Sequence, residues 1–384
     1  MNLVVEIITG IAILLGLIYT IMIGMFCVGW MMTKPKFDSA KEDVFVSIII
    51  PVRDEEDTID MVLDDLIIQG YDKTMFEIII VDDGSTDETV EVIKDFFDTE
   101  NNIKVIVNNG SGKKDAITTA MKIAKGELII TTDADCSRGE NWIQDIVYFY
   151  RETHAKMIVS PVFIEYDTPL FSKMQSLEFM SLVASGGGAL YFENAILCNG
   201  ANLAYTKQVW EEVNGFEGVE QTATGDDVLL MYKIKEKYPD GIKFLKSLSA
   251  TVITEAKPTL KEFFNQRKRW ASKPFGMLNT ETKIVSLVVY FFSFFILLLL
   301  DIGCFYPNIN FFEYPVIKIC ILLFAVKCVI DFLLLLLATI FFEEKKLLIW
   351  FLPMQIIYLF YVVITGFSGL SKKYEWKGRI INEK

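Results

Sequence analysis

Three acidic clusters and one basic cluster contain the residues of this chain that could do chemistry. The acidic clusters are Asp82-Asp83, Asp133-Ala-Asp135 and Asp226-Asp227, and the basic cluster is Gln266-Arg-Lys-Arg-Trp270. Carboxylate oxygens are the ligands that Mg²⁺ and Mn²⁺ prefer, and such ions commonly bridge protein carboxylates and substrate phosphates. Arginines neutralise a diphosphate through bidentate hydrogen bonds. Together these clusters predict an enzyme that handles a nucleotide diphosphate at a membrane surface.

Each acidic cluster also has a plainer interpretation. Asp133 and Asp135 fit a solvated turn with a helix-capping aspartate, and Asp226-Asp227 fit first-turn acids that match a helix dipole. Their occurrence together, with Asp133 directly after a predicted strand, favours a cation site at Asp133 and Asp135. One carboxylate of Asp226-Asp227 would then act as the general base on an acceptor hydroxyl, and the other would orient it.

Several familiar sites are excluded. Gly110-Ser-Gly-Lys-Lys114 is not a P-loop, because the first glycine and the Ser or Thr after the lysine are missing. Lys113 can still meet a phosphate as a point charge. No GxGxxG pattern is present, which argues against NAD. His154 is the only histidine, so we interpret it as structural and exclude a histidine-based triad or a zinc site.

Strands that alternate with helices must position these clusters. Val44–Val52 is a continuous run of mostly β-branched residues, typical of a strand buried on both faces. The sequence predicts further strands and helices, in alternation, at Ile59–Ile67, Glu77–Val81, Thr89–Phe97, Ile103–Val107, Ala116–Ala124 and Glu127–Thr132. This α/β order predicts a mainly parallel sheet, which binds ligands at the carboxyl ends of its strands. Asp82-Asp83 and Asp133-Ala-Asp135 fall at that edge.

The bulk composition limits the partners and the compartment. The chain has 384 residues, 52% of them apolar, and a formal net charge of −13. Nucleic acid is disfavoured as a partner, because phosphate contacts need clustered Lys and Arg. The six cysteines form no CxxC pair, so we interpret them as free thiols and expect the central domain to lie in a reducing cytoplasm.

Four apolar runs are long enough to span a membrane: Leu3–Val28, Ile284–Ile302, Val316–Phe342 and Leu347–Leu370. Lys34 and Lys36, after the first and uncleaved run, predict a cytoplasmic central domain. Four spans would put the tail outside, whereas its five basic residues favour the inside. Either the last run is re-entrant or interfacial, or the tail charge is overridden; we expect four spans.

Two other apolar segments carry unusual residues. Leu170–Leu197 contains Gly186-Gly-Gly188 and is too interrupted to span, so the sequence predicts an interfacial helix or a core segment. Lys327 and Asp331 lie within the third apolar run at i, i+4 spacing. They can pair on one helix face in the interior of a helix bundle.

In this order, the motifs resemble those of inverting family 2 glycosyltransferases with a GT-A fold, anchored in membranes, of the ceramide and hopanoid glucosyltransferase-like or polysaccharide synthase-like branch. The resemblance runs from about Val44 to Trp270. It rests on six motifs: Val46-Ser-Ile-Ile-Ile-Pro-Val-Arg-Asp-Glu-Glu56, Val81-Asp-Asp-Gly-Ser-Thr-Asp87, Gly112-Lys113, Asp133-Ala-Asp135, Gly225-Asp-Asp227 and Gln266-Arg-Lys-Arg-Trp270.

The resemblance implies roles for particular residues. The residues that would bind the nucleotide sugar are Pro51, Arg53, Glu55, Asp83, Lys113, Asp133, Gln266 and Arg269. Asp135, together with Asp133, would hold Mg²⁺ or Mn²⁺, and Trp270 would contact the acceptor. Asp227 would be the catalytic base with Asp226 beside it. The family often has Glu-Asp where this chain has Asp226-Asp227, and this departure leaves open which carboxylate is the base.

We therefore expect a metal-dependent hexosyltransferase that moves one sugar from a UDP-sugar to a membrane lipid. The alternative is a processive polysaccharide synthase, although three membrane helices after the domain are few for secreting a chain. A membrane nucleotidyltransferase and an inactive scaffold are alternatives of other classes. The expected organisation is an anchor at 1–32, a cytoplasmic GT-A domain with interfacial helices at 33–283, about three membrane helices at 284–371 and a basic tail at 372–384. The expected location is a bacterial-type cytoplasmic membrane.

Overall fold

A computed structural model describes residues 2–34, 44–97, 102–220, 222, 225–271, 275–369, 373–376 and 379–382. The chain forms two units that interleave along the sequence. One unit comprises Met32–Asp167 and Leu190–Ala256, and we call it the α/β unit. The other comprises Met1–Met31, Thr168–Ala189 and Lys257–Lys384, and we call it the helical unit.

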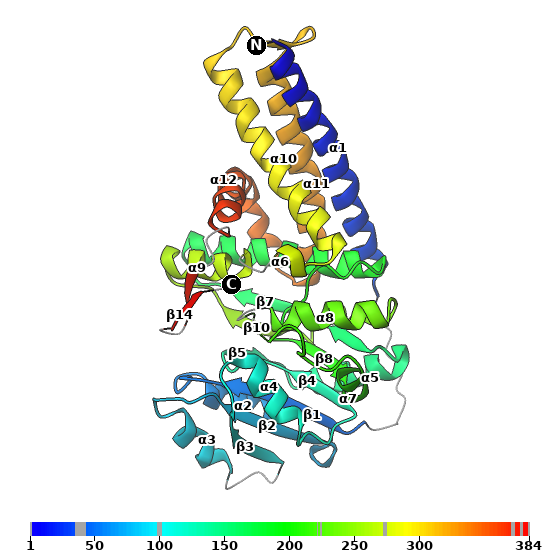
Figure 1. Ribbon diagram of the computed structural model, residues 1–384, viewed down its shortest axis with the longest axis vertical. Coiled ribbons are helices and arrows are strands. Elements are labelled where there is room, and N and C mark those ends of the chain that lie inside the picture. The colour runs from blue at the N-terminus through cyan, green and yellow to red at the C-terminus, as the bar shows by residue number, and fades with distance from the viewer. Residues whose placement is uncertain are drawn as a thin grey trace. The chain divides into compact units, whose positions relative to one another are not determined.

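In the described part of the α/β unit, a seven-stranded sheet has the order β3-β2-β1-β4-β8-β6-β9 (Figure 1). Its strands are β1 (Val46–Val52), β2 (Phe76–Asp82), β3 (Ile103–Val107), β4 (Leu128–Thr131), β6 (Met157–Val159), β8 (Leu203–Thr206) and β9 (Ile242–Phe244). The first four pair in parallel, as the sequence predicts. β8 runs antiparallel to both β4 and β6, and β9 is parallel to β6. The sheet is therefore mainly parallel with one reversed strand.

A smaller three-stranded sheet has the order β5-β10-β7 among the described residues. Its strands are β5 (Cys136–Arg138), β7 (Val162–Glu165) and β10 (Val252–Glu255). β10 is antiparallel to β5 and parallel to β7. Because β5 starts directly after Asp135, this sheet fixes the far side of the Asp133-Ala-Asp135 turn.

Helices follow the strands along the chain. They are α2 (Ile59–Ile67), η1 (Lys73–Met75), α3 (Thr89–Phe97), α4 (Lys113–Met121), α5 (Trp142–Thr153), α7 (Lys207–Glu212) and α8 (Asp226–Lys237). In α2 the buried side chains recur with the helical period, which is the stripe that a surface helix turns toward a core. α4 begins three residues before the predicted start, because Gly112 adopts a φ of 90° and lets the helix begin at Lys113.

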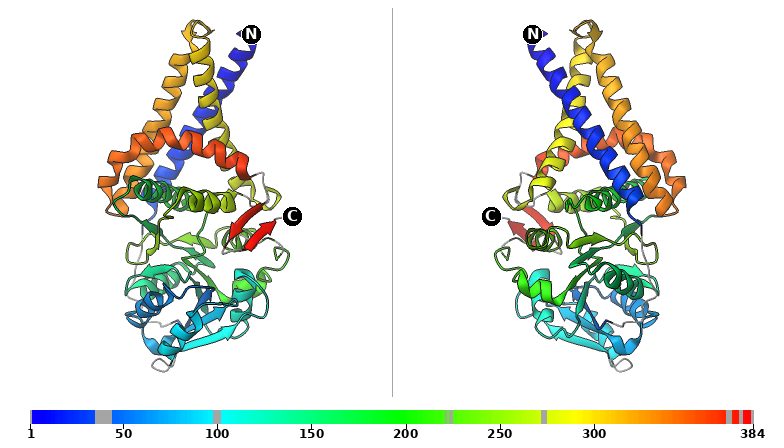
Figure 2. Two further views of the ribbon diagram at one scale, coloured as in Figure 1. Left: turned by 90° about the vertical axis from the view of Figure 1, so that its left-hand side faces the viewer. Right: turned by 90° about the vertical axis from the view of Figure 1, so that its right-hand side faces the viewer.

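The helical unit contains long apolar helices and two shorter helices that run across them. Four helices of the described residues are long and apolar enough to cross a membrane: Leu3–Met32, Thr280–Phe305, Val316–Phe341 and Lys345–Ser368. They contain α1 (Asn2–Met32), α10 (Thr280–Phe305), α11 (Val316–Phe341), and η3 (Lys345–Trp350) with α12 (Phe351–Gly369). Figures 1 and 2 show α1, α10 and α11 side by side, with α6 (Leu170–Tyr191), α9 (Leu260–Ala271) and α12 running across them.

The remaining elements of the helical unit are short. They are η2 (Phe275–Met277), the hairpin of β11 (Asn310–Phe311) with β12 (Tyr314–Pro315), and the hairpin of β13 (Lys373–Trp376) with β14 (Arg379–Asn382). The first hairpin joins α10 to α11 and lies at the same end of the bundle as the start of α1 (Figure 1). The second hairpin follows α12, and β13 lies against α9.

Glycines allow α1 and α6 to cross with their backbones in contact. A Cβ atom built on Gly29 would overlap the carbonyl oxygen of Gly188, and one on Gly188 would overlap the carbonyl oxygen of Phe26. α6 passes through Gly186-Gly-Gly188 without a break. The glycine run in this segment therefore serves a close helix crossing.

A buried polar cluster joins three of the apolar helices. The Lys327 ammonium of α11 lies 2.5 Å from the Asp331 carboxylate and donates to the Gln355 side-chain oxygen of α12 at 2.8 Å. The Tyr19 hydroxyl of α1 donates to the other oxygen of Asp331 at 2.7 Å. Lys327 and Asp331 thus pair as their spacing predicts, and their charges are neutralised inside the bundle.

Candidate active site

The carboxyl ends of β1, β2 and β4 meet at one edge of the large sheet. Val52 at the end of β1 pairs in register with Asp82 at the end of β2, and Ile49 pairs with Thr131 at the end of β4. Loops that leave this edge carry the motif residues that follow each strand. Because polar backbone and side-chain groups collect at such an edge, it is where an α/β sheet binds its ligand.

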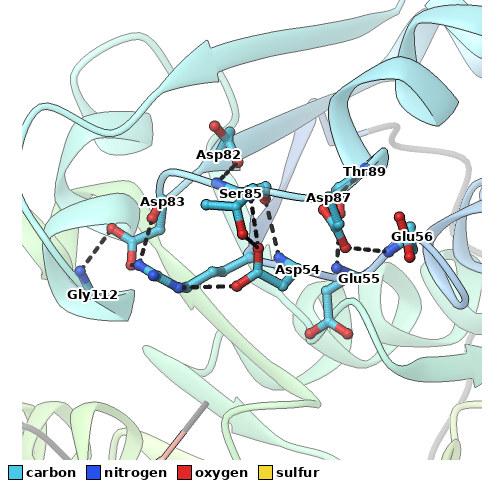
Figure 3. A network of polar contacts seen from close by, with 11 residues as sticks. Asp54, Glu55, Glu56, Asp82, Asp83, Ser85, Asp87, Thr89 and Gly112 are labelled. Atoms are coloured by element: carbon cyan, nitrogen blue, oxygen red, sulfur yellow. Dashed lines mark hydrogen bonds and ion pairs between the residues drawn. The ribbon is translucent and has the colours of Figure 1, made fainter. Parts of the chain in front are cut away.

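Asp83 is a buried acid that accepts hydrogen bonds at this edge (Figure 3). Its Oδ1 accepts from the Asn108 side-chain amide at 2.6 Å and from the Gly112 N–H at 2.8 Å. The Arg53 guanidinium donates to the Asp83 carbonyl oxygen at 3.0 Å and lies 3.7 Å from its carboxylate. These contacts bring β1, β2 and the start of α4 together around a buried carboxylate. Asn108 and the Gly112 N–H have roles that the motif analysis did not include.

The loop after β1 is fastened to the loop after β2. Asp54, at a φ of 50°, accepts from the Thr86 N–H at 2.8 Å, and its own N–H donates to Ser85 at 3.1 Å. The Glu55 N–H donates to the Thr89 hydroxyl at 2.8 Å. In Figure 3 the Glu55 carboxylate points away from the other labelled acids. The backbone of Glu55 is therefore held by this network, while its carboxylate lies outside it.

Lys113 connects two of the acidic clusters. Its ammonium donates to Asp133 Oδ1 at 2.6 Å and lies 3.6 Å from Asp226 Oδ2. Burial would lower the pKa of Lys113, but the charges of Asp133, Asp226 and Asp227 outweigh burial and raise it. Lys113 therefore stays cationic, and the structure brings Lys113, Asp133 and Asp226 into one site.

Asp133, Asp135 and Cys136 place possible metal ligands within 4.8 Å of one another. The carboxylates of Asp133 and Asp135 suit a hard ion such as Mg²⁺ or Mn²⁺. The thiol does not, because sulfur is a soft ligand and these ions prefer oxygen. Burial, with the charges of Asp135 and Asp133, also raises the pKa of Cys136 above its usual value. Cys136 instead donates to Asp135 at 3.4 Å. The donor set therefore fits a cation held by two carboxylates and completed by substrate oxygens.

Asp226 and Asp227 open α8 after Gly225, which has a φ of 79°. One oxygen of Asp227 accepts from the Gly200 N–H at 3.1 Å, and the other accepts from the Val228 N–H at 2.7 Å. Burial raises the pKa of Asp226, which the Lys113 ammonium only partly offsets. The two neighbours thus differ: backbone amides hold Asp227, and a lysine faces Asp226.

The loop before α8 is tied to α4 by Lys114, a residue that the motif analysis did not single out. The Lys114 ammonium donates to the carbonyl oxygens of Val219 at 2.6 Å and Thr222 at 2.8 Å, and also to the Thr222 hydroxyl. The side chain is buried. Of two consecutive lysines at the start of α4, one therefore contacts the Asp226 carboxylate and the other holds Val219 and Thr222, which precede it in the chain.

The basic motif Gln266-Arg-Lys-Arg-Trp270 forms the end of α9 in the helical unit. Gln266, Arg269 and Trp270 are all partly exposed. Arg267, one of the two motif arginines that could neutralise a diphosphate, is instead buried and donates to the Glu178 carboxylate of α6 at 2.7 Å. Its guanidinium lies 4.1 Å from the Trp270 ring centroid. This ion pair fixes the helix that carries the motif onto α6.

The Glycosyl transferase family 2 profile matches residues 47–213. The matched range starts within β1 and includes Asp83, Lys113, Asp133 and Asp135. This chain carries a family 2 glycosyltransferase domain. The family 2 glycosyltransferase domain expected from the motifs is thereby confirmed over this range.

Named proteins resemble the chain over different lengths. The probable glycosyltransferase YdaM of Bacillus subtilis (strain 168) is 26% identical over 291 residues, which cover 68% of this chain and 65% of YdaM. The glycosyltransferase AglE of Haloferax volcanii is 32% identical over 101 residues, which cover 26% of this chain and 33% of AglE. The matches thus span less than two thirds of either relative.

A solved structure resembles almost the whole chain. The mannosyltransferase PcManGT from Pyrobaculum calidifontis, in complex with GDP-Man and Mn²⁺, aligns over 94% of this chain and 99% of its own with a TM-score of 0.57. The sequence identity is 16%, so the likeness shows the fold alone. The family 2 domain has a GT-A-like α/β fold with a mainly parallel sheet, in a chain that also has four candidate membrane helices.

Proposed function

We propose that this chain is an inverting, metal-dependent glycosyltransferase that moves a sugar from a nucleoside diphosphate sugar to a hydroxyl of a membrane lipid. One observation carries the proposal: within or just after a family 2 domain, Lys113, Asp133 and Asp226 lie within ion-pair distance. This arrangement supports the proposal, because the carboxylate that would bind the cation and an acid of the pair that would activate the acceptor both contact Lys113.

The donor would bind at the carboxyl edge of the sheet. Asp83, held by Asn108 and the Gly112 N–H, presents a fixed acceptor for a base or a ribose. Pro51 and Arg53 lie at the end of β1 and just beyond it, and Glu55 follows in the loop. The proposed donor is a UDP-sugar. Its diphosphate would lie against Asp133 and Asp135.

Asp133 and Asp135 would hold Mg²⁺ or Mn²⁺. A cation there supplies positive charge that offsets the charge growing on the leaving diphosphate. In the helical unit, Gln266 and Arg269 would bind the same diphosphate. The pairing of Arg267 with Glu178 supports this role, because it sets the face that α9 presents.

Asp227 is the proposed general base. It would take the proton of the acceptor hydroxyl as that oxygen attacks the anomeric carbon on the face opposite the diphosphate, which inverts the configuration. The Gly200 and Val228 N–H groups hold its carboxylate in one orientation. Asp226, which faces Lys113, would shape the field around the reaction without taking the proton.

The acceptor is proposed to be a membrane lipid, with Trp270 as its contact. α9 lies against α6 and α12, and only eight residues separate its end from α10, which is apolar enough to span a membrane. An acceptor that enters from the lipid would therefore meet α9 first. The proposed location is a bacterial-type cytoplasmic membrane with the α/β unit in the cytoplasm, because Lys34 and Lys36 follow α1.

The test uses the purified full chain in vesicles of native lipid extract, supplied with Mn²⁺ and a panel of nucleotide sugars. We expect one UDP-sugar to give UDP and a lipid bearing a single sugar, identified by mass spectrometry. A ladder of polymer lengths would instead indicate a processive synthase, and release of pyrophosphate would indicate a nucleotidyltransferase.

Asp227→Asn tests the base. We expect turnover to fall by roughly 10²–10⁴-fold, the usual contribution of general base catalysis. Asp240→Asn is the matched control, because Asp240 is exposed in the turn after α8. If Asp227→Asn kept near-normal turnover while Asp226→Asn abolished it, the base would be Asp226.

A further inference from the structure

The first turn of α4 is the point where all three acidic clusters meet. The Gly112 N–H donates to Asp83. The Lys113 ammonium contacts Asp133 and Asp226. The Lys114 ammonium donates to a carbonyl oxygen of the loop before α8. Gly112 and Lys114 are thus anchored on either side of Lys113. The backbone of Lys113 is fixed, and the part that remains able to move is its long side chain.

Lys113 contacts an oxygen that a divalent cation at Asp133 could also use. Its Nζ lies 2.6 Å from Asp133 Oδ1. A Mg²⁺ ion would bind a carboxylate oxygen at about 2.0–2.1 Å. An ammonium and a divalent ion on one carboxylate repel each other. Asp133 should therefore bind the ion more weakly while it holds the lysine.

The carboxylates around Lys113 need a positive charge. The Lys113 ammonium lies 2.6 Å from Asp133 and 3.6 Å from Asp226. A Cβ atom on Gly200 would lie 2.9 Å from the Lys113 Nζ, so the ammonium lies beside the residue whose N–H holds Asp227. Without a cation, these like charges would repel one another across the site.

We propose that Lys113 holds the place of the divalent cation until the nucleotide arrives. The inference rests on the proposed function and deepens it. The ammonium that bridges Asp133 and Asp226 competes with the ion for Asp133, so the ion must displace it to bind well. The diphosphate gives the ammonium a new anionic partner, and Lys113 then releases Asp133 to the ion and Asp226 to the acceptor side. Ion and nucleotide consequently bind together far better than either binds alone.

The experiment measures Mn²⁺ binding by electron paramagnetic resonance, with the purified full chain in detergent. Titrations are run without nucleotide and again with saturating UDP. The variants are Lys113→Gln, which removes the ammonium, Lys113→Arg, which keeps a cation, and Lys122→Gln. Lys122 is the matched control, because it is exposed just beyond the other end of α4 and its loss changes the net charge equally.

We expect Lys113→Gln to bind Mn²⁺ alone about tenfold more tightly than the native chain, a difference of about 1.4 kcal/mol. Lys113→Arg should stay weak, and Lys122→Gln should stay close to native. UDP should strengthen Mn²⁺ binding by the native chain much more than by Lys113→Gln. Thermal unfolding of each variant checks that the fold is retained.

Mn²⁺ binding by Lys113→Gln that equals or is weaker than native binding would overturn the inference. An equal gain in Lys122→Gln would also overturn it, because it would mean a general charge effect.

The proposed function fails separately. Sugar transfer with no gain in Mn²⁺ binding would remove the place-holding role alone. The expected Mn²⁺ pattern with no transfer from any nucleotide sugar would remove the glycosyltransferase proposal alone.

Discussion

Glu77 is a buried carboxylate that fastens the amino-terminal side of the sheet, opposite the candidate site. It accepts from the Ser47 hydroxyl at 2.7 Å, from the Lys125 N–H at 2.7 Å and from the Lys104 ammonium at 2.5 Å. These donors come from β1, from the segment before β4 and from β3. One side chain therefore joins four neighbouring segments of the domain.

Glu77→Gln should lower stability at neutral pH. Burial would raise the pKa of Glu77, but hydrogen bonds from Lys104, Lys125 and Ser47 outweigh it and lower the pKa below its ordinary 4.5. The carboxylate thus stabilises the fold above that pH, and the contribution is lost as the pH falls through the lowered pKa. We expect a loss of about 1–3 kcal/mol near pH 7.

Thermal unfolding in detergent, recorded from pH 7 down to pH 4, measures this effect. The gap in melting temperature between native and Glu77→Gln should narrow toward the acid end. Glu236→Gln, on the exposed face of α8, is the control and should change little. A gap that stayed constant with pH would show that Glu77 acts by packing alone.

At the residue scale, the sequence predicts the acids but not their partners. The sequence singles out Asp83, Asp133 and Asp226 as candidate site residues, because three acidic pairs occur together at predicted strand and helix ends. Lys113 was predicted only as a phosphate contact, since nothing in the spacing reveals that α4 starts early enough to aim it at Asp133. Arg267 looked like part of a basic patch, and its partner Glu178 is 89 residues away in sequence.

At the element scale, the crossing of α1 and α6 depends on two glycines. Alanine normally favours a helix over glycine by about 1 kcal/mol. Here a Cβ on Gly188 would overlap the backbone of α1, and one on Gly29 would overlap the backbone of α6. Both helices would have to separate to accept it, which costs typically 1–3 kcal/mol.

We expect Gly188→Ala and Gly29→Ala each to lower the melting temperature of the detergent-solubilised protein. Gly10→Ala is the matched control in α1, because a Cβ there meets no atom within 4 Å, and it should be neutral or mildly stabilising. Equal behaviour of Gly188→Ala and Gly10→Ala would mean that the two helices can slide apart at little cost.

The elements near the amino terminus of the domain are predicted well, and those after Asp135 poorly. The sequence predicts a strand at Val44–Val52, and β1 is Val46–Val52. A short, continuous run of mostly β-branched residues is typical of a strand buried on both faces. β6 and β9 have only three residues each and β8 has four, too few to show a period. The reversed strand β8 was therefore not predicted.

At the scale of the whole molecule, the arrangement of the helical unit helps to decide on which side of the membrane the tail lies. Counting the spans predicts an outside tail, whereas counting the basic residues predicts an inside tail. In Figures 1 and 2, α12 runs across α1, α10 and α11 rather than alongside them. The hairpin after it lies against α9, which joins the α/β unit to α10. Three spans with a re-entrant or interfacial α12 would satisfy both the tail charge and this contact.

We predict that the tail lies on the same side as the α/β unit. Green fluorescent protein fused after Lys384 should fluoresce, and alkaline phosphatase at the same place should be inactive. A fusion after Phe342 should behave in the same way, whereas one after Phe312, between α10 and α11, should show the opposite pattern. Opposite results at Phe342 and Lys384 would mean that α12 spans the membrane.

The ion pair between Glu178 and Arg267 has a consequence for biosynthesis. The ribosome releases α6 before the 89 residues that lead to Arg267 have been made, and α12 follows later still. During that interval the apolar helix α6 carries the Glu178 carboxylate without Arg267 and without its aromatic neighbours on α9. Because α6 lies between β7 and β8 in the sequence, the α/β unit cannot finish folding before α6 has been synthesised. We expect the nascent chain to depend on early contact with the membrane or a chaperone, and expression without the segment after Ala256 to yield aggregates.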